Sequence, residues 1–182
     1  MNNKTGFTLA EVLITLVIIG IIAAMTVPTL MTNTNSQEYR TALKKSIAML
    51  NQAITMQYAL DGTRISDFTG STVNVRDSVF AKRLNVITTS NTATTFGTTG
   101  NSATAVFYTA DGMKFGLATA TGTCDAEGTS PCYTVYIDVN GDKKPNTATT
   151  ATTKPLDVYT ALIYSQRVVP DGAITQGVMY DQ

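Results

Sequence analysis

The 182-residue sequence contains no histidine and no tryptophan. Histidine is the commonest general base and the commonest metal ligand in proteins, so its absence counts against much acid–base and transition-metal chemistry. An excess of charge of one sign is also lacking, because 13 basic residues balance 13 acidic ones. A neutral chain has no bulk attraction for nucleic acid or anionic lipid, and we predict no nucleic-acid partner. Since the sequence has no glycine-rich phosphate loop, zinc-ligand spacing or nucleophile–base pair, we do not expect an enzyme.

Charge is missing altogether between Glu11 and Glu38. Within that stretch, Val12–Pro28 reads VLITLVIIGIIAAMTVP, with threonine as its only polar residue. A run of roughly 18 or more apolar residues is long enough to span a bilayer as a helix. Lys4 precedes the run and no basic residue follows it until Arg40, so the positive-inside tendency places the N-terminus of a single-pass protein in the cytoplasm.

Two ordinary interpretations explain only part of this segment. A secretory signal peptide would have a shorter apolar core and a cleavage site at its far end, which the small residues around Ala24 could imitate. A plain membrane anchor explains the hydrophobicity but not Glu11, because a carboxylate inside a membrane segment costs about 2.5–3.5 kcal/mol. Snorkelling of Glu11 toward the interface remains an alternative explanation for that carboxylate.

A third interpretation accounts for every feature. The string KTGFTLAEVLITLVIIGIIAA resembles the leader and N-terminal segment of type IV prepilins and type II secretion pseudopilins. In that family a short basic leader ends in glycine, a phenylalanine follows, and a glutamate is the fifth mature residue; here these are Gly6, Phe7 and Glu11. The resemblance implies cleavage after Gly6 by a prepilin peptidase and N-methylation of the new Phe7 amine. It also gives Glu11 a role in assembly, since its carboxylate can neutralise the Phe7 amine of an adjacent subunit.

A helical pattern continues beyond the apolar run. Apolar residues recur at spacings of three and four on one helix face, at Tyr39, Leu43, Ile47, Leu50, Ile54 and Tyr58. We therefore predict a nearly continuous helix from about Phe7 to Leu60, ended by Asp61-Gly62. Pro28 lies inside it and predicts a kink or local unwinding, because proline removes a backbone hydrogen bond and clashes with the preceding turn.

The C-terminal half carries the signals of an antiparallel sheet. Ala105–Thr109 and Met113–Ala118 flank a turn containing Asp-Gly and predict a hairpin. Cys132–Val139 alternates as a third strand, and Leu156–Tyr164 is interpreted as a strand rather than a short helix. The sequence thus predicts an α+β, pilin-like fold, in which a long N-terminal helix packs on a three- to four-stranded antiparallel sheet; the arrangement of the elements is what the resemblance implies.

The connection between helix and hairpin is less distinctive. Asn74–Leu84 predicts a short helix capped by Asn74. The threonine-rich segments Thr88–Ala105 and Asn146–Thr153 predict exposed loop or edge strand, with O-glycosylation of a surface filament as the alternative. The tail from Val168 gives no clear signal.

Two cysteines, Cys124 and Cys132, bracket the connection that leads into the third strand. In a chain that leaves the cytosol, an even and closely spaced pair predicts a disulfide. Two free thiols in a reducing compartment are the alternative.

A calcium site is the one candidate for bound chemistry. Asp138, Asn140 and Asp142 alternate like the first half of an EF-hand loop, but Lys143 stands where that loop has glycine and Thr149 where it has a bidentate acid. The segment DVNGDKKPN also resembles a stretch of pseudopilins, which bind calcium after the sheet, and this adds Asp157 to the expected ligands. A polar turn without metal is the alternative.

Together these signals predict four segments: a leader (1–6), a transmembrane half-helix (7–30), an amphipathic half-helix (31–61) and a globular domain (62–182). The resemblance implies a structural subunit of a type IV pilus-like or type II secretion pseudopilus filament. Its expected partners are copies of itself, other pilin-like subunits, the prepilin peptidase and an inner-membrane assembly platform. Its expected location is the inner membrane as precursor and an extracytoplasmic filament after assembly. A membrane-tethered extracytoplasmic binding module that does not polymerise is the alternative.

Overall fold

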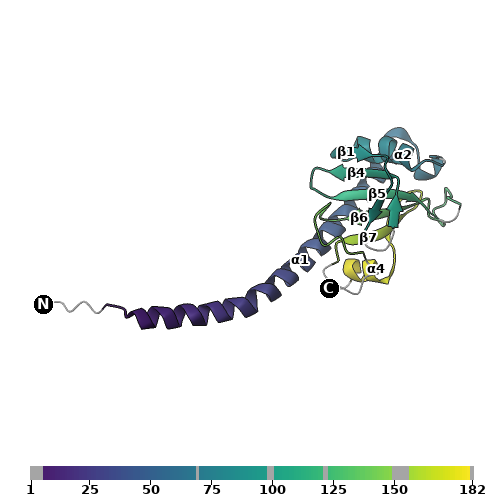
Figure 1. Cartoon of the computed structure of the whole chain (residues 1–182). Helices are drawn as coiled ribbons and strands as arrows, with labels where there is room; N and C mark the ends of the chain where they lie inside the picture. The colour runs from purple at the N-terminus through teal and green to yellow at the C-terminus, as the bar shows by residue number, and fades with distance from the viewer. Residues whose placement is uncertain (1–5, 69, 98–100, 121–122, 149–155, 181–182) are drawn as a thin grey trace. The chain divides into compact units, whose positions relative to one another are not determined.

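The computed structural model describes residues 6–68, 70–97, 101–120, 123–148 and 156–180. The chain divides into two compact units, Met1–Gln37 and Glu38–Gln182. The long helix α1 begins at Leu9 and ends at Asp61 (Figure 1), which confirms the predicted helix to within two residues at each end. Residues 1–5 of the expected leader lie outside the described residues.

In the first unit, α1 is continuous through Pro28. The sequence-based expectation of a kink at this proline stays a prediction. Gly20, also in this part of the helix, has open space around it, since a Cβ built there meets no neighbouring atom within 4 Å.

In the second unit, the predicted apolar face of α1 is the buried one. Leu43, Ile47, Leu50 and Ile54 are at most 5% exposed. Tyr58 departs from the pattern, being 47% exposed with the Arg64 guanidinium over its ring. The helix ends as expected at the next glycine, whose positive φ of 68° permits a bond from its N–H to the Tyr58 carbonyl at 3.0 Å.

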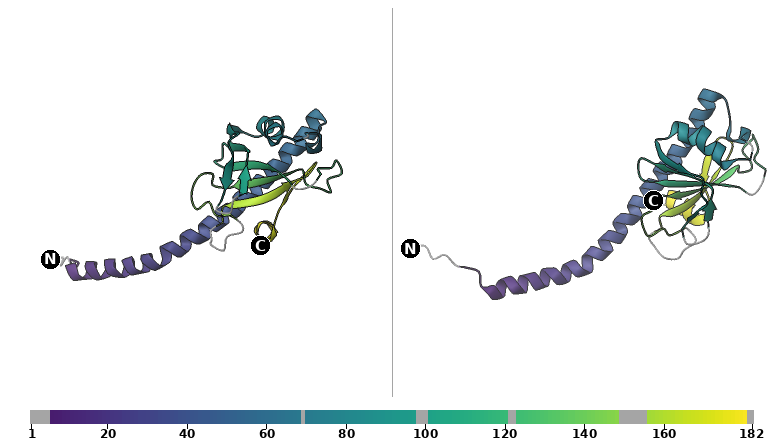
Figure 2. Two further views of the ribbon diagram at one scale, coloured as in Figure 1. Left: turned by 45° about the vertical axis from the view of Figure 1, so that its right-hand side comes forward. Right: turned by 45° about the horizontal axis from the view of Figure 1, so that its top comes forward.

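A six-stranded antiparallel sheet packs against this part of α1 (Figures 1 and 2). Its strand order is β1-β4-β5-β6-β7-β8. The strands are β1 (Val86–Ser90), β4 (Ala105–Thr109), β5 (Lys114–Thr119), β6 (Tyr133–Asp138), β7 (Val158–Ile163) and β8 (Val168–Pro170). The α+β prediction is confirmed, with the hairpin as β4–β5 and the two further strands as β6 and β7. The predicted count of three to four strands is too low, because the short edge strands β1 and β8 come from segments without a clear apolar alternation.

The pleat of the sheet separates two apolar clusters. Cross-strand neighbours Phe107, Phe115, Ile137 and Tyr159 face the main core, which contains α1, and the first two rings stack with centroids 4.9 Å apart. The opposite face carries Val106, Tyr136 and Val158 with a smaller cluster. Since successive residues of a strand alternate between faces, both sides of this sheet must be covered.

The small hairpin β2 (Thr94–Phe96) and β3 (Asn101–Ala103) covers the second face. Its Phe96 is 1% exposed and lies directly on Gly116 of β5. A Cβ at position 116 would be 2.3 Å from the Phe96 ring and 2.7 Å from the Ala103 Cβ. Glycine is needed at this point of β5 because the hairpin approaches the strand so closely.

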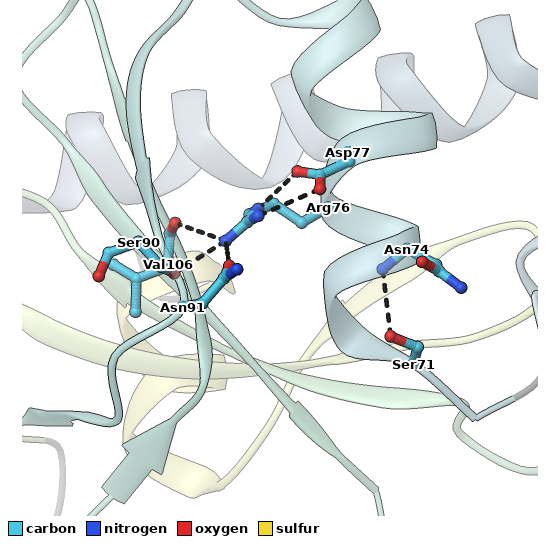
Figure 3. Close-up of polar contacts among 7 residues, drawn as sticks. All are labelled: Ser71, Asn74, Arg76, Asp77, Ser90, Asn91 and Val106. Carbon is cyan, nitrogen blue, oxygen red and sulfur yellow. Dashed lines mark hydrogen bonds and ion pairs between the residues drawn. The ribbon is translucent and has the colours of Figure 1, made fainter.

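The connection after α1 contains a short 3₁₀ turn, η1 (Ile65–Asp67), and then the helical segment α2 (Thr72–Val75), the π-helical turn η2 (Arg76–Phe80) and α3 (Ala81–Arg83). The prediction that Asn74 caps this segment is wrong. The cap is Ser71, whose hydroxyl accepts the Asn74 N–H at 3.4 Å, so the helix begins one turn earlier (Figure 3). Val75, Val79 and Phe80 are buried in the main core.

Arg76 fixes this connection to the edge of the sheet. Its guanidinium is buried, pairs with Asp77 at 2.7 Å, and donates to the Ser90 carbonyl at 2.8 Å and to Asn91 Oδ1 at 2.7 Å (Figure 3). A buried arginine is tolerated only when its donors are paired, and these partners meet that requirement.

The two edge strands are protected differently. At β8, the Asn51 side chain of α1 acts like a neighbouring strand: its Oδ1 accepts the Val168 N–H at 2.8 Å and its Nδ2 donates to the Val168 carbonyl at 3.2 Å. At β1, the pairing register with β4 shifts between Val86 and Thr88. Beyond β8 the chain forms the helix α4 (Ala173–Tyr180), which gives the tail a definite structure.

Cys124 and Cys132 form a disulfide, which confirms the predicted pair. Within the loop that they close, the Asp125 carboxylate accepts the backbone N–H groups of Gly128, Thr129 and Ser130. The loop is therefore held by a covalent bond and by a local hydrogen-bond network before β6 begins.

Candidate functional site

The predicted processing and assembly residues lie together at the start of α1. Gly6 and Phe7 precede the helix and are exposed. Thr8 and Glu11 form a reciprocal cap: Glu11 Oε2 accepts the Thr8 N–H at 2.9 Å, and Thr8 Oγ1 accepts the Glu11 N–H at 3.3 Å. The Thr8 hydroxyl also donates to Glu11 Oε2 at 2.8 Å. This S/T-x-x-E capping box explains locally why the helix starts at Leu9.

The capping box also determines where the Glu11 charge lies. The carboxylate is turned back toward Thr8 and accepts the N–H of the Phe7–Thr8 peptide, one residue after the peptide at which cleavage would create an amine. Sequence reasoning identified Glu11 but did not consider that Thr8 could hold its carboxylate. The Thr-x-x-Glu spacing was the available signal.

The apolar segment that follows is exposed along its length. Leu9–Pro28 has a mean hydropathy of 2.5 and is the one described helix segment long and apolar enough to cross a membrane. None of its most apolar window is buried. In water such a surface is strongly unfavourable, so the segment requires lipid or other apolar helices around it.

A second candidate site lies where β6 ends and β7 begins. Asp138 is 2% exposed and Asp157 is fully buried, and the pKa of Asp138 is raised to about 7 by burial and by the nearby Asp157 charge. Asp157 accepts the backbone N–H of Asn146 at 2.7 Å and of Thr147 at 2.5 Å. The structure thus brings together two of the predicted calcium ligands as a buried carboxylate pair.

Asn140, the third predicted ligand, lies in the loop between them. Its Nδ2 donates to the Tyr39 hydroxyl at 3.2 Å and to the Lys144 carbonyl at 3.3 Å. Its Oδ1 is buried and has no hydrogen-bond partner. An unpaired buried amide oxygen is costly, and a bound cation is one way to satisfy it.

Asp142, the fourth predicted ligand, is engaged elsewhere. It pairs with Lys114 of β5 at 2.7 Å, and this bond holds the pKa of Asp142 below its usual range. Lys114 is itself buried, with its ammonium 5.0 Å from the Phe96 ring centroid and 5.7 Å from that of Tyr108. Burial opposes its charge, but the Asp142 partner leaves the pKa of Lys114 raised.

The predicted set of four therefore separates into Asp138, Asn140 and Asp157 on one side and an ion pair of Asp142 with Lys114 on the other. Sequence reasoning missed Lys114 and Tyr39. Among the described residues no group of three or more histidine, cysteine or acidic residues is suited to hold a metal ion. Thr149, the position of the missing bidentate acid, lies outside the described residues.

Comparison with known proteins supports the interpretation of the N-terminus. Residues 1–27 match the prokaryotic N-terminal methylation motif. The chain is 41% identical over 63 residues to the type II secretion system core protein G of Aeromonas hydrophila, a stretch that is 35% of this chain and 43% of the relative. The protein of the same name from Vibrio cholerae is 40% identical over 63 residues, 35% of this chain and 42% of the relative.

These matches confirm a prepilin-type N-terminal segment and a similarity to pseudopilins. The matched stretch spans less than half the length of either relative. No solved structure matches the chain.

Proposed function

We propose that this protein is a structural subunit of an extracytoplasmic filament of the type IV pilus or type II secretion pseudopilus kind. One observation carries the proposal: an apolar helix of 20 residues, Leu9–Pro28, is unburied in the single subunit and lies almost wholly within a methylation motif, residues 1–27, that contains Glu11. Such a helix can lie in the membrane before assembly and among identical helices afterwards. The names of the two relatives favour the secretion pseudopilus over an adhesive or motile pilus.

The residues at the start of α1 support a definite processing step. We propose cleavage of the Gly6–Phe7 peptide by a prepilin peptidase, followed by methylation of the Phe7 amine. Both residues precede the helix and are exposed, so the peptide is accessible to an enzyme. The protein would then act with copies of itself, other pilin-like subunits and an inner-membrane assembly platform, and it would perform no catalysis of its own.

The first prediction concerns this processing. Protein isolated from membranes and filaments should begin at Phe7 and carry one N-methyl group, as read by intact mass and terminal sequencing. Gly6→Ala should slow cleavage, whereas Gly20→Ala, a change of the same size in open space further along α1, should be cleaved normally. A mature chain beginning near Ala24 would indicate an ordinary signal peptide and would contradict the proposal.

We further propose that calcium binds the loop after β6. Asp138 and Asp157 supply carboxylate oxygens, Asn140 supplies an amide oxygen without a partner, and calcium prefers such oxygen ligands. The cation would relieve the repulsion between the two buried carboxylates. Since calcium takes six to eight oxygen ligands, backbone carbonyls of the loop or water would complete the set.

The second prediction tests this ligand set. In detergent, calcium should raise the Tm of the full chain relative to chelator, because a ligand that binds only the native state stabilises it. Asp157→Asn should remove the calcium-dependent rise. Asp142→Asn should retain most of it, because Asp142 is paired with Lys114 and not with the other ligands. An unchanged Tm of the unmutated protein would show that the segment is only a turn.

A further inference from the structure

The loop between β6 and β7, which carries the candidate calcium ligand Asn140, is connected to α1 by a hydrogen bond. The Tyr39 hydroxyl of α1 accepts from Asn140 Nδ2 at 3.2 Å, across 101 positions of sequence. Tyr39 is the second residue of the unit that begins at Glu38, and it is partly buried against the main core. The contact therefore joins the loop to the first turn of α1 within the globular unit.

This bond has a consequence for the orientation of the Asn140 amide. The amide nitrogen has two hydrogens, and Tyr39 and the Lys144 carbonyl accept one each. With the nitrogen fixed on that side, the oxygen is left as the buried atom without a partner. The Lys144 carbonyl, which can only accept, distinguishes this orientation from the flipped one, and the Tyr39 hydroxyl holds the amide in place. Loss of the hydroxyl would remove one of the two contacts that fix the amide.

Tyr39 packs against the main core, to which Tyr159 of β7 belongs. The Tyr159 hydroxyl donates to the Leu156 carbonyl at 2.6 Å, next to Asp157. Tyr39 thus contacts Asn140 of the loop directly, and the core against which it packs includes the strand that Asp157 precedes.

We propose that Tyr39 is a positioning residue that couples cation binding in the loop to the order of α1 at the start of the globular unit. This inference rests on the proposed calcium site and adds its regulation. A cation that binds the Asn140 oxygen fixes the amide, the fixed amide strengthens the bond to Tyr39, and the first turn of the globular part of α1 opens less often. By linkage, the same bond increases the affinity of the loop for the cation.

The experiment measures binding and helix order separately. Full-length protein in detergent is titrated with calcium chloride by calorimetry, and amide hydrogen exchange is recorded with calcium and with chelator. In the unmutated chain, calcium should slow exchange at residues 38–43 at least fivefold more than at residues 50–54, which serve as the internal reference. Tyr39→Phe should remove this difference and weaken calcium binding about fivefold, as expected for one lost hydrogen bond.

Tyr58→Phe is the matched control, because it removes a hydroxyl from the same helix at a position remote in sequence from the loop contact and keeps the ring beneath Arg64. It should behave like the unmutated chain. Calcium binding with equal slowing at both segments would indicate general stabilisation and would overturn the coupling while leaving the calcium site intact. Absence of calcium binding would overturn both, and a Tyr39→Phe protein with unmutated behaviour would assign the coupling to another contact. None of these results bears on filament assembly, which is read by subunit yield.

Discussion

Glu11→Gln should reduce filament assembly at least tenfold while leaving membrane insertion and the outer unit intact. Glutamine can complete the capping box with Thr8, because the box accepts either side chain, but it cannot neutralise an amine. Among bundled apolar helices the Phe7 amine of a neighbour would then be left unpaired. Breaking a buried ion pair by removing one partner costs about 3–5 kcal/mol, more than the 1.4 kcal/mol that corresponds to a factor of ten.

The measurement is the yield of sheared or secreted filament per membrane-resident subunit, in cells lacking an unmutated copy. Glu11→Ala should be equally defective, Glu11→Asp intermediate, and Thr8→Ala, which keeps the charge and weakens only the cap, closest to normal. If glutamine supports normal assembly and Thr8→Ala does not, Glu11 acts by capping the helix. Normal yields from all four variants would favour a carboxylate that only snorkels, and a non-polymerising membrane module would then be the better interpretation of the protein.

Phe96→Ala should lower the free energy of unfolding of the globular unit by about 3–5 kcal/mol, the usual cost of truncating a buried phenylalanine. The ring is 1% exposed and covers Gly116, so its removal leaves a cavity in the smaller apolar cluster on the second face of the sheet. It also removes the aromatic ring that lies beneath the Lys114 ammonium. Denaturant unfolding of the full chain in detergent, followed by near-ultraviolet circular dichroism, would measure the loss.

A double-mutant cycle with Gly116→Ala separates packing from other effects. Alone, Gly116→Ala should cost about 1–3 kcal/mol, because its Cβ would lie 2.3 Å from the ring. Combined with Phe96→Ala, it should cost less, because the ring is gone and the Ala103 Cβ, at 2.7 Å, remains as the nearest obstruction. Gly112→Ala, at a turn glycine with open space but a positive φ of 82°, should cost about the same in both backgrounds. Additive costs at Gly116 would show that contact with the Phe96 ring is not what makes this substitution unfavourable.

The elements that could be predicted from sequence are those whose signal is local. The apolar periodicity of α1 and the Asp-Gly turn between β4 and β5 require no knowledge of distant residues. The strands β1, β2, β3 and β8 have three to five residues each and come from segments rich in threonine, serine or proline. Such short segments acquire strand structure from their neighbours in the sheet, and sequence pattern carries little of that information.

The prediction of where the helix after α1 begins was wrong for a local reason. Ser71 stands three residues before Asn74, and both are good capping residues. The β-branched residues Thr72 and Val73 in between weaken the helical signal, which favoured the later cap. The π-helical turn at Arg76–Phe80 adds a residue to one turn of the helix. The spacing of apolar residues in this segment does not predict such an insertion.

The candidate cation site was partly predictable for a similar reason. Asp138 and Asn140 are close in the chain, and Asp157 immediately precedes β7, whose first residue Val158 pairs with Asp138, so strand pairing brings them together. The engagement of Asp142 by Lys114 depends on the β5–β6 register, which sets Lys114 opposite Asp138. That register is a property of the folded sheet, so the separation of Asp142 from the other ligands could not be read from the spacing.

Asn51 has a consequence for how subunits crowd together. By occupying both backbone groups of Val168, it leaves β8 without a free donor and acceptor at that residue, while the irregular pairing of β1 disturbs the opposite rim. Exposed strand edges at high local concentration can pair with the edges of neighbouring molecules, and repeated pairing of this kind leads to amyloid. In the proposed filament, outer units protected in this way would lie close together without joining their sheets.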